Sequence, residues 1–501
     1  MSAAEESTLT VELPDEAATA ALAEDIAAGL AVGDIVALSG GLGAGKTTFA
    51  RALLRALAGD PDLEVPSPTF TLVQTYAVGR LTVAHFDLYR ISGIDELDEI
   101  GLADAAKEGV VLVEWPERAG NRLPAERLSI VFTIAGSGRR ATVSGEGAPW
   151  ERFQRSRAAR ALVEAAGWSG ATRRVLEGDA STRTYERVRQ GARSAVLMDW
   201  PSRGQLTAGD PRAVFRARDA RAFVAVDAAL RAAGLSAPEI QAADVASGLL
   251  LLEDFGTEGL IVDGAADVRR YRVAIEALAA IHVEPRPPEL PLPGGGTYRL
   301  PHLRGEALLA EISIFADWYA PLAMGAPLAD VTRAELVSVW RSLGDRLAKA
   351  EQSWVLFDIQ SPNLFWLAER SGIARIGIID FQDMFFGPSA YDVASLCHDA
   401  RISISPAMEE ELVGHYVALR RAADAAFDAD SFHAAFAICA ALRSAKNMGA
   451  FVRLAGIGNP IYLKHLSRLR AYLRRALSHP VLSPFAVWYE RHLPPQDQAV
   501  R

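Results

Sequence analysis

Eight residues near the N-terminus, Gly40 to Thr47, have the composition and spacing of a phosphate-binding loop. The motif Gly-Gly-Leu-Gly-Ala-Gly-Lys-Thr follows the apolar run 35–38 and precedes the helix-like segment 49–54. Glycines let successive backbone N–H groups point at an anion, and a helix N-terminus adds partial positive charge. The sequence therefore predicts a nucleotide-binding loop made of Gly40, Gly41, Leu42, Gly43, Ala44, Gly45, Lys46, Thr47 and Thr48. Lys46 is expected at the outer phosphates and the Thr47 hydroxyl on Mg²⁺. The alternative is a glycine-rich turn before a helix.

A second set of polar residues lies in the C-terminal part, at Asp358, Asn363 and Asp380. Asp358 and Asn363 have the Asp-x-x-x-x-Asn spacing, and Asp380 ends the next apolar run in an Asp-Phe pair. In kinases such a trio comprises a catalytic base and two Mg²⁺ ligands. Each of these residues alone is common in turns, whereas their joint spacing favours a phosphotransfer site.

Two more apolar runs in the N-terminal part end in acidic residues, at Asp87 and at Glu114. In open α/β sheets, ligands bind at the carboxyl ends of the strands. Asp87 is therefore a candidate to orient water or Mg²⁺, Glu114 a candidate Mg²⁺ ligand and Trp115 a candidate neighbour of the nucleotide. Solvated strand ends are the competing interpretation.

These residues need strands and helices to position them, and the hydrophobic patterns supply both. In the N-terminal part a strand and a helix, 7–13 and 15–30, precede the glycine-rich loop, and further strands are predicted over 70–76, 81–90 and 109–116. In the C-terminal part, strands are predicted within 174–188, at 194–201 and at 249–256. The predicted fold is an α/β P-loop domain, with a mostly parallel sheet flanked by helices, followed by an α+β bilobal kinase-like domain.

Bulk composition limits the function classes. A chain of 501 residues is long enough for two or three domains. Its net charge of −10 argues against a broad nucleic-acid-binding face. Cys397 and Cys439 are too few and too far apart for a disulfide framework. Apolar runs such as 248–252 are far shorter than the roughly 20 residues of a membrane span, and no targeting segment is evident, so a soluble cytoplasmic protein without membrane contact is expected.

Four segments of the N-terminal part, in order, resemble the small bacterial ATPases that help to make threonylcarbamoyladenosine in tRNA, the TsaE family. The segments are 40–47, 67–72, 85–90 and 114–117, and the resemblance covers about residues 10–150. It implies that the loop amides and Lys46 bind ATP, that Thr47 and Glu114 hold Mg²⁺, and that Asp87 is needed for hydrolysis. It also implies protein partners that perform the threonylcarbamoyl transfer, so that any link to tRNA is indirect.

The C-terminal part resembles the aminoglycoside phosphotransferase and choline kinase superfamily, above all its anomeric kinases of N-acetylmuramate and N-acetylglucosamine. The resemblance covers about residues 165–485 and is carried by the segments 178–181, 196–199, 252–254, 361–364, 379–383, 387–392 and 443–454. It implies that Asp358 accepts the proton of an anomeric hydroxyl and that Asn363 and Asp380 bind Mg²⁺. It further implies that Glu253 and Phe255 line the adenine of ATP.

Three features depart from that superfamily's pattern. Leu356 and Phe357 stand where a polar pair such as His-Arg often precedes the catalytic Asp, and Gln360 occupies a common His position. Met198 stands where most kinases have the phosphate-binding Lys. Ser181 and Arg183, in the turn between two predicted strands, are candidate phosphate contacts, although a hairpin needs the same residue types.

The acceptor pocket is predicted from an aromatic stripe within 306–322. Glu311 and Trp318 are its candidate sugar contacts, since a carboxylate accepts hydrogen bonds from sugar hydroxyls and an indole stacks on a pyranose ring. Aromatic residues at helical spacing also build helix cores, which is the alternative.

The predicted domains are an ATPase domain (1–155), a linker (156–170), a kinase-like first lobe (171–255) and a helical second lobe (256–501). The leading hypothesis is a fusion of two enzymes that use ATP and Mg²⁺: an ATPase for tRNA modification and an amino-sugar kinase. The alternatives make the second half an aminoglycoside or other small-alcohol kinase, or a pseudokinase scaffold that regulates the ATPase.

Overall fold

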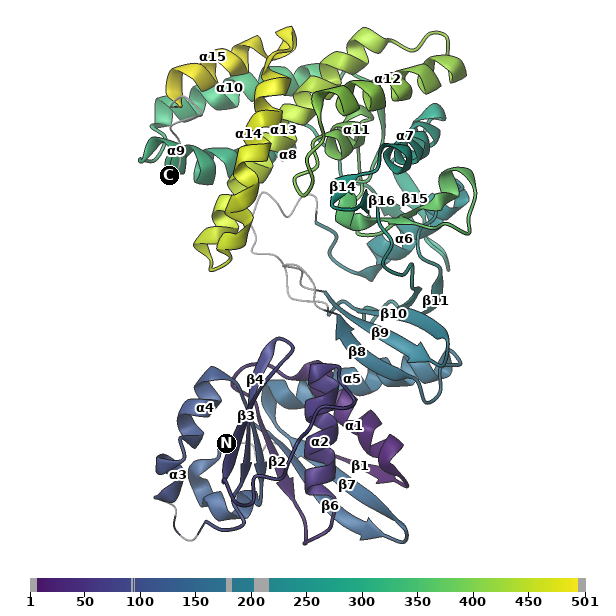
Figure 1. The fold of residues 1–501 in the computed structure, drawn as a ribbon. Helices are drawn as coiled ribbons and strands as arrows, with labels where there is room; N and C mark the ends of the chain where they lie inside the picture. Colours follow the sequence, from purple (N-terminus) through teal and green to yellow (C-terminus); the bar gives the residue numbers. More distant parts are fainter. Residues whose placement is uncertain (1–6, 92, 94, 177–182, 202–215, 494–501) are drawn as a thin grey trace. The chain divides into compact units, whose positions relative to one another are not determined.

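The computed structural model describes residues 7–91, 93, 95–176, 183–201 and 216–493 (Figure 1). The chain divides into two compact units, and the division is not a single cut in the sequence. The first unit contains residues 1–201 and 240–254, and the second contains residues 202–239 and 255–501. The first sheet of the kinase-like half therefore belongs to the same unit as the glycine-rich loop.

A seven-stranded sheet forms the centre of the first unit, with the strand order β1-β7-β6-β2-β5-β4-β3. The strands β6, β2, β5 and β4 pair in parallel, whereas β7 and β3 run antiparallel to their neighbours. This confirms the predicted, mostly parallel sheet. The strands are β1 Ser7–Leu13, β2 Ile35–Ser39, β3 Val73–Val78, β4 Leu81–Asp87, β5 Val110–Glu114, β6 Leu128–Ala135 and β7 Gly138–Gly145.

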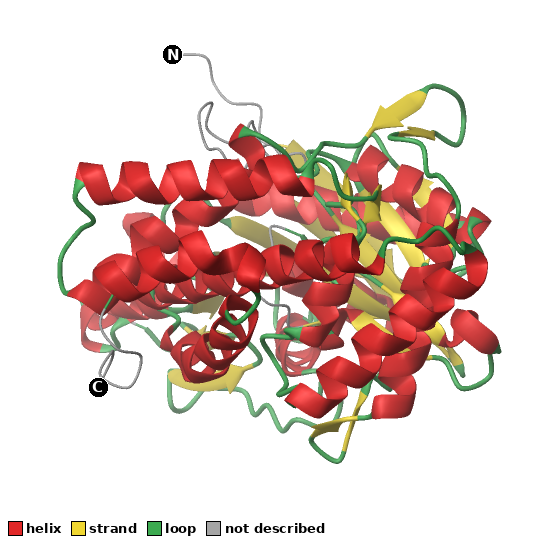
Figure 2. Ribbon diagram, turned by 90° about the horizontal axis from the view of Figure 1, so that it is seen from above, coloured by secondary structure: helices red, strands yellow, loops and turns green. Residues whose placement is uncertain are grey.

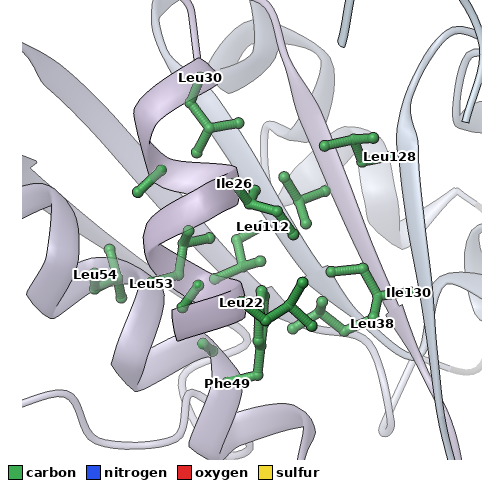
Figure 3. Close-up of a cluster of buried hydrophobic side chains, with 14 of the residues drawn as sticks. Leu22, Ile26, Leu30, Leu38, Phe49, Leu53, Leu54, Leu112, Leu128 and Ile130 are labelled. Carbon is green, nitrogen blue, oxygen red and sulfur yellow. The ribbon is translucent and has the colours of Figure 1, made fainter. Parts of the chain in front are cut away.

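Helices cover both faces of this sheet. On one face, Leu22 and Ile26 of α1 and Phe49 and Leu53 of α2 pack on buried strand residues such as Leu112 (Figure 3). A smaller apolar cluster on the other face joins α3 and α4 to β4 and β5. Asp15 caps α1 as predicted, because its Oδ1 accepts from the Ala18 N–H at 2.8 Å. The helices are α1 Glu16–Gly29, α2 Lys46–Ala58, α3 Glu96–Glu99, α4 Leu102–Glu108 and α5 Gly147–Ala165, with the 3₁₀ segment η1 at Pro116–Arg122.

A second sheet in the first unit has five antiparallel strands in the order β11-β12-β10-β9-β8. Helix α5 packs on it, since Ala159 and Val163 share an apolar cluster with Val188, Leu197 and Leu251. Residues 156–165 of the predicted linker are thus the end of a packed helix. The strands are β8 Thr172–Leu176, β9 Thr184–Gln190, β10 Arg193–Asp199, β11 Ile240–Asp244 and β12 Leu249–Glu253.

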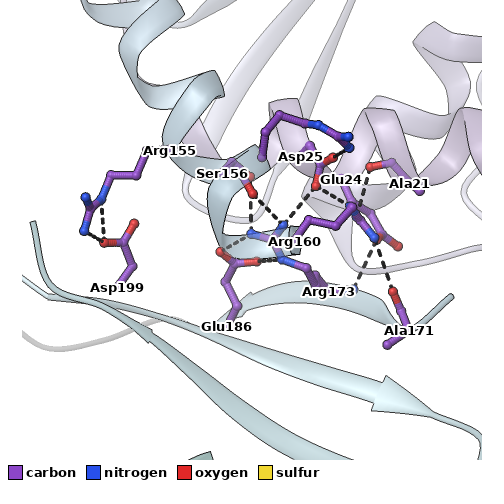
Figure 4. A network of polar contacts seen from close by, with 11 residues as sticks. Ala21, Glu24, Asp25, Arg155, Ser156, Arg160, Ala171, Arg173, Glu186 and Asp199 are labelled. Atoms are coloured by element: carbon purple, nitrogen blue, oxygen red, sulfur yellow. Dashed lines mark hydrogen bonds and ion pairs between the residues drawn. The ribbon is translucent and has the colours of Figure 1, made fainter. Parts of the chain in front are cut away.

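A buried ionic network joins the two sheets through α1 and α5 (Figure 4). Asp25 of α1 is 0% exposed and accepts from three guanidinium groups: Arg157 at 2.7 Å, Arg160 at 2.6 Å and Arg173 at 2.9 Å. Arg173, on β8, also makes two hydrogen bonds to Glu186 of β9, both 2.9 Å long. Helix α1 of the first sheet is therefore tied to β8, at the edge of the second sheet, by charged groups of which Asp25, Arg160 and Arg173 are buried.

Most of the second unit is helical, and the helices of the chain are drawn in red in Figure 2. Its longest helix, α13, has buried side chains on all sides and packs against α8, α11 and α14. Gly449 lets α13 approach the neighbouring segment closely, because a Cβ there would lie 2.2 Å from the Ile314 carbonyl oxygen. The helices are α6 Ala220–Ala232, α7 Val268–Val283, α8 Glu306–Ile314, the π-helix η3 Phe315–Tyr319, α9 Ala320–Met324, α10 Asp330–Leu347, α11 Ala390–Cys397, α12 Pro406–Ala423, α13 Ala429–Gly456, α14 Leu466–Leu477 and α15 Ser483–His492.

Short antiparallel strand pairs interrupt the helices of the second unit. Two of them, β17 with β20 and β18 with β19, flank the segments that carry Asp358, Asn363 and Asp380. One stretch of the described residues, Glu306–Met324, is apolar and long enough to cross a membrane, but 61% of its most apolar window is buried inside the structure. The strands are β13 Ile261–Val262, β14 Ala265–Ala266, β15 Glu289–Pro291, β16 Thr297–Arg299, β17 Gln352–Val355, β18 Leu364–Trp366, β19 Ile376–Ile378 and β20 Phe385–Pro388; the 3₁₀ segments are η4 Ser361–Asn363, η5 Gly372–Arg375, η6 Pro460–His465 and η7 Pro480–Leu482.

Candidate active sites

The glycine-rich loop connects β2 to α2, where the sequence predicts it. Gly40, Gly43 and Gly45 have φ angles of 137°, 73° and 109°, which side chains with a Cβ rarely adopt. Gly40 is also required by space, because a Cβ at this position would lie 2.5 Å from the Phe132 carbonyl oxygen. The loop ends at the N-terminus of α2, whose first N–H groups have no partner within the helix. This geometry suits an anion such as a nucleotide phosphate.

Lys46 is buried at the first position of α2 and turns back over the loop. Its Nζ donates to the carbonyl oxygens of Gly40 at 2.8 Å and Gly41 at 3.0 Å, and lies 3.8 Å from the centre of the Trp115 ring. Burial lowers the pKa of Lys46, and the carboxylates of Glu114 and Asp87 partly offset this effect. Lys46 and Trp115, which are far apart in the sequence, are thus in contact.

The acidic residues meet beside Lys46 because β4 and β5 are parallel neighbours with Asp87 opposite Glu114. Thr47 Oγ1 donates to Glu114 Oε2 at 3.0 Å, which brings the two predicted Mg²⁺ ligands together. Asp87 Oδ2 accepts from Thr69 Oγ1 at 2.7 Å. The buried His85 lies 3.1 Å from Glu114 Oε1 and orients this carboxylate. His85 was missed as a site residue, although its position two residues before Asp87 on one strand puts both side chains on the same face.

Oxygen donors of this kind are those that Mg²⁺ binds. Thr47 and Glu114 supply a hydroxyl and a carboxylate, and Mg²⁺ commonly completes its shell with phosphate oxygens and water. A cavity of about 270 Å³ adjoins the loop and is lined in part by Gly43, Gly45 and Thr48. The donor set therefore fits Mg²⁺ next to a bound nucleotide.

In the second unit, two buried carboxylates hold the loop that carries Asp358. Asp392 accepts hydrogen bonds from the N–H groups of Leu356 at 2.6 Å and Phe357 at 3.1 Å. Burial raises the pKa of Asp392 to about 7, although both N–H groups and Arg443 favour its ionised form. Asp399 accepts the N–H of Ser361 at 2.7 Å. The loop is thereby fixed on both sides of Asp358.

The predicted trio comes together between the short strand pairs. Asn363 Nδ2 donates to the Asp358 carbonyl oxygen at 2.8 Å and lies 3.5 Å from Asp380 Oδ2. Asp380 has a φ angle of 60°, and its Oδ1 accepts from Gln382 Nε2 at 3.0 Å. An amide oxygen and a carboxylate fit Mg²⁺ when phosphate oxygens and water complete its shell. Within the described ranges, no group of three or more His, Cys, Asp or Glu side chains forms a metal site of protein ligands alone.

Cationic side chains to which the sequence assigned no role lie near Asp358. Arg443 of α13 lies 3.5 Å from Asp358 Oδ1 and donates to the Phe357 carbonyl oxygen at 2.6 Å. Burial acts to raise the pKa of Asp358, but the charges of Lys446, Arg443 and Arg216 outweigh it and hold that pKa below its usual value. Helix periodicity indicates only that α13 is buried, so its contacts with the loop were not predictable.

The other predicted residues of the kinase-like half lie in different places. Ser181 is outside the described residues. Arg183 lies over the Trp200 ring at 5.2 Å, and Glu253 ends β12 in the first unit. Phe255, in the second unit, packs on Phe365 with 5.9 Å between ring centres. Met198 is fully buried in β10, where it pairs with Leu250 of β12.

The two candidate sugar contacts differ in their surroundings. Glu311 is 3% exposed and forms an ion pair with Lys446 of α13 at 2.6 Å. Trp318 is 38% exposed, whereas its neighbours Phe315 and Tyr319 are buried and stack on each other. Most of the aromatic stripe is therefore helix core, which was the alternative, and Trp318 faces outward.

Two segments of the chain match known protein families. Residues 13–142 match the family described as threonylcarbamoyl adenosine biosynthesis protein TsaE, and residues 172–427 match the phosphotransferase enzyme family. The chain is 34% identical over 362 residues, 68% of its length, to an N-acetylmuramate/N-acetylglucosamine kinase of Caulobacter vibrioides and spans 97% of that protein. It is 42% identical over 128 residues, 25% of its length, to the tRNA threonylcarbamoyladenosine biosynthesis protein TsaE of Bacillus subtilis and spans 77% of that protein. Among solved structures, the choline kinase LicA from Streptococcus pneumoniae matches 64% of this chain and 99% of its own at 14% identity, with a TM-score of 0.42.

The folds and sites define a P-loop nucleotide-binding domain and a kinase-type phosphotransferase domain on one polypeptide. The chain belongs to the TsaE family through its N-terminal segment and to the phosphotransferase enzyme family through its C-terminal segment. It is a fusion of the two, as predicted.

Proposed function

We propose that the chain is a bifunctional enzyme: an ATP hydrolase that supports threonylcarbamoyladenosine modification of tRNA, and a kinase that phosphorylates the anomeric hydroxyl of N-acetylmuramate or N-acetylglucosamine. The observation that carries the kinase proposal is the convergence of Asp358, Asn363 and Asp380 on a loop clamped by Asp392. The identity of 34% to a kinase named for these two sugars supports this choice of acceptor.

In the kinase half, Asp358 is the proposed catalytic base. It accepts the proton of the anomeric hydroxyl while the sugar oxygen bonds to the γ-phosphorus of ATP and the bond from that phosphorus to the ADP oxygen breaks. Asn363 and Asp380 would hold Mg²⁺, whose charge would offset the negative charge of the phosphates when it is bound. Glu253 and Phe255 are the proposed neighbours of the adenine. Trp318 is the proposed sugar contact, and Glu311 is proposed to affect the acceptor indirectly, through its ion pair with Lys446.

In the ATPase half, the loop amides and Lys46 bind the phosphates, and Asp87 orients the water that attacks them. Thr47 and Glu114 hold Mg²⁺, and Trp115 contacts the nucleotide. Because an ATPase of this kind makes no modified base itself, its proposed partners are the proteins that transfer the threonylcarbamoyl group, and tRNA is reached only through them. Cytoplasmic location is part of the proposal, since both ATP and tRNA are found there.

One experiment separates the two activities and their alternatives. The full chain, Lys46→Ala and Asp358→Asn are incubated with Mg-ATP and a panel of amino sugars and aminoglycosides. We expect an acid-labile sugar 1-phosphate that is lost only in Asp358→Asn, and basal ATP hydrolysis that falls in Lys46→Ala. A methyl glycoside of N-acetylglucosamine, which lacks the free anomeric hydroxyl, is the matched substrate control and should stay unmodified.

The other outcomes contradict the proposal in distinct ways. Phosphorylation of an aminoglycoside in place of the sugars would identify a drug kinase. Binding of ATP to the second half without phosphorylation of any acceptor would support a pseudokinase scaffold, for which Met198 and the altered loop residues Leu356 and Phe357 are the relevant features.

A further inference from the structure

Two cations on one face of α13 are directed at the catalytic loop of the kinase half. Arg443 and Lys446 are one helical turn apart, so their side chains lie on the same side of the helix. Both are buried, and Lys446 is only 8% exposed. A lysine is rarely buried to this extent unless it is paired.

Lys446 contacts the loop and an acidic partner at the same time. Its Nζ lies 3.8 Å from the centre of the Phe357 ring, directly before Asp358 in the chain. The same Nζ lies 2.6 Å from Glu311 Oε2 of α8. Glu311 thus holds the ammonium group against the catalytic loop, and three separate segments meet at this point.

The loop itself has no basic residue between Leu356 and Gln360. The side chain of Asp358 is only 24% exposed, so water solvates its carboxylate incompletely and the protein must compensate its negative charge. Arg443 reaches Oδ1 of Asp358, and Lys446 adds a second positive charge from the neighbouring turn of α13. Positive charge next to Asp358 is thus supplied by α13, which lies far from the loop in the sequence.

The charged groups that act on Lys446 lie on α8, on the loop of Asp358 and on α13 itself. Burial acts to lower its pKa; Glu311 of α8 and Asp358 of the loop oppose this effect, and Arg443 of α13 reinforces it. Glu311 and Asp358 balance the charges of Lys446 and Arg443, and Arg216, the third cation near Asp358, pairs with Asp383 at 2.8 Å, which makes burial of the cluster tolerable.

We propose that Lys446 is a positioning residue for Asp358, and that Glu311 fixes its ammonium group beside the catalytic loop. Lys446 and Arg443 together hold the Asp358 carboxylate in one orientation, with Oδ1 toward Arg443 and Oδ2 toward the acceptor hydroxyl. This inference rests on the proposed kinase function. Glu311 then supports the catalytic base Asp358 and affects the acceptor only through Lys446.

The test uses the full-length chain carrying Lys46→Ala, so that ATP turnover by the first half is silenced. Into this background we place Lys446→Met, which keeps the length of the side chain but removes its charge, together with Lys446→Arg and Glu311→Gln. Arg475→Met is the matched control, because Arg475 is a half-buried cation of the same unit that pairs with Glu409 at 3.1 Å. Two rates are measured: sugar phosphorylation, and the slow hydrolysis of ATP with water as acceptor.

We expect Lys446→Met to lower kcat for the sugar on the order of 10²-fold, the cost of a misplaced catalytic group, with KM for ATP unchanged. Lys446→Arg should recover part of this loss, Glu311→Gln should show a smaller loss, and Arg475→Met should keep the parent kcat. An unchanged kcat in Lys446→Met would overturn the proposal. So would equal losses in Lys446→Met and Arg475→Met, since these would reflect general destabilisation.

Hydrolysis with water as acceptor distinguishes failure of this inference from failure of the proposed function. If no sugar is phosphorylated, the proposed acceptor is wrong, but hydrolysis that is lost in both Asp358→Asn and Lys446→Met still supports the role of Lys446. Hydrolysis that depends on Asp358 but not on Lys446 would refute it. A parent chain that neither phosphorylates sugars nor hydrolyses ATP in its second half would overturn both.

Discussion

Replacing Asp25 by Asn should loosen the attachment between the ATPase core and the first kinase sheet. Asp25 accepts from Arg157, Arg160 and Arg173, and the latter two are buried. Asparagine keeps the shape of the side chain but removes its negative charge. Two guanidinium groups then remain in the interior with less compensation than before, which is costlier than losing a surface pair.

The size of the stability loss in Asp25→Asn depends on the partners that the three arginines keep. Breaking one member of a buried ion pair costs about 3–5 kcal/mol in the free energy of unfolding. Arg173 keeps its two hydrogen bonds to Glu186, and Arg160 keeps Glu24 at 3.0 Å. Arg157 is nearer the surface and can turn to water. We therefore expect a loss of about 3 kcal/mol, at the lower end of that range.

Native-state hydrogen exchange of the full chain is the suitable assay, because it resolves the opening of individual segments. In Asp25→Asn the free energy of opening should fall together in α1, α5 and β8, while α13 in the second unit serves as an internal reference. Asp104→Asn is the matched control, since Asp104 pairs with Lys107 on the exposed surface. If α1 and β8 exchange as slowly in Asp25→Asn as in this control, the reasoning is refuted.

Three further predictions concern single positions. Gly40→Ala should abolish nucleotide binding to the first half, measured by calorimetry, because the new Cβ would lie 2.5 Å from the Phe132 oxygen at a φ of 137°; normal affinity would contradict this account. Asp87→Asn should lower ATP hydrolysis by roughly 10²- to 10⁴-fold while nucleotide affinity stays unchanged; equal losses of both would indicate a structural role instead. Burial, reinforced by Arg420, lowers the pKa of His282 to about 4, so the neutral ring is preferred in the folded state. The stabilisation from His282 is therefore present above about pH 6.5 and is lost as pH falls toward 4, by about 3 kcal/mol in total. His282→Asn should flatten the dependence of the free energy of unfolding on pH, measured by urea unfolding of the second unit. An unaltered pH dependence would show that another group causes it.

The sequence determined those features whose cause is local. Glycines at fixed spacing before Lys46 and Thr47 have few conformational options between a buried strand and a helix, so the loop could be recognised from the motif alone. Apolar runs likewise predicted β4 and β5, and with them the placement of Asp87 and Glu114 at strand ends. Asp358 and Asn363 were predicted from their spacing, because both lie in the short segment between β17 and β18, and Asp380 was predicted from its place at the end of the next apolar run.

Only the tertiary structure decided which distant segments meet. His85 orients Glu114, Lys46 lies on Trp115, and Arg443 and Lys446 of α13 reach the loop of Asp358. Each of these contacts depends on strand order or on how helices cross; the local sequence showed only that His85 and Asp87 share a face of β4. The sequence also placed a linker at 156–170, whereas most of this segment lies in or beside a helix that packs on both sheets of the first unit.

The buried network at Asp25 illustrates the same limit. A lone Asp in a helix and an Arg in a strand are ordinary surface residues when each is considered alone. Their charges become energetically important only after folding removes water from both and brings them within 2.9 Å of each other. Sequence patterns therefore identified the two enzyme domains. The packing of α1, α5 and β8 determined that the first sheet of the kinase-like half is joined to the core of the ATPase domain.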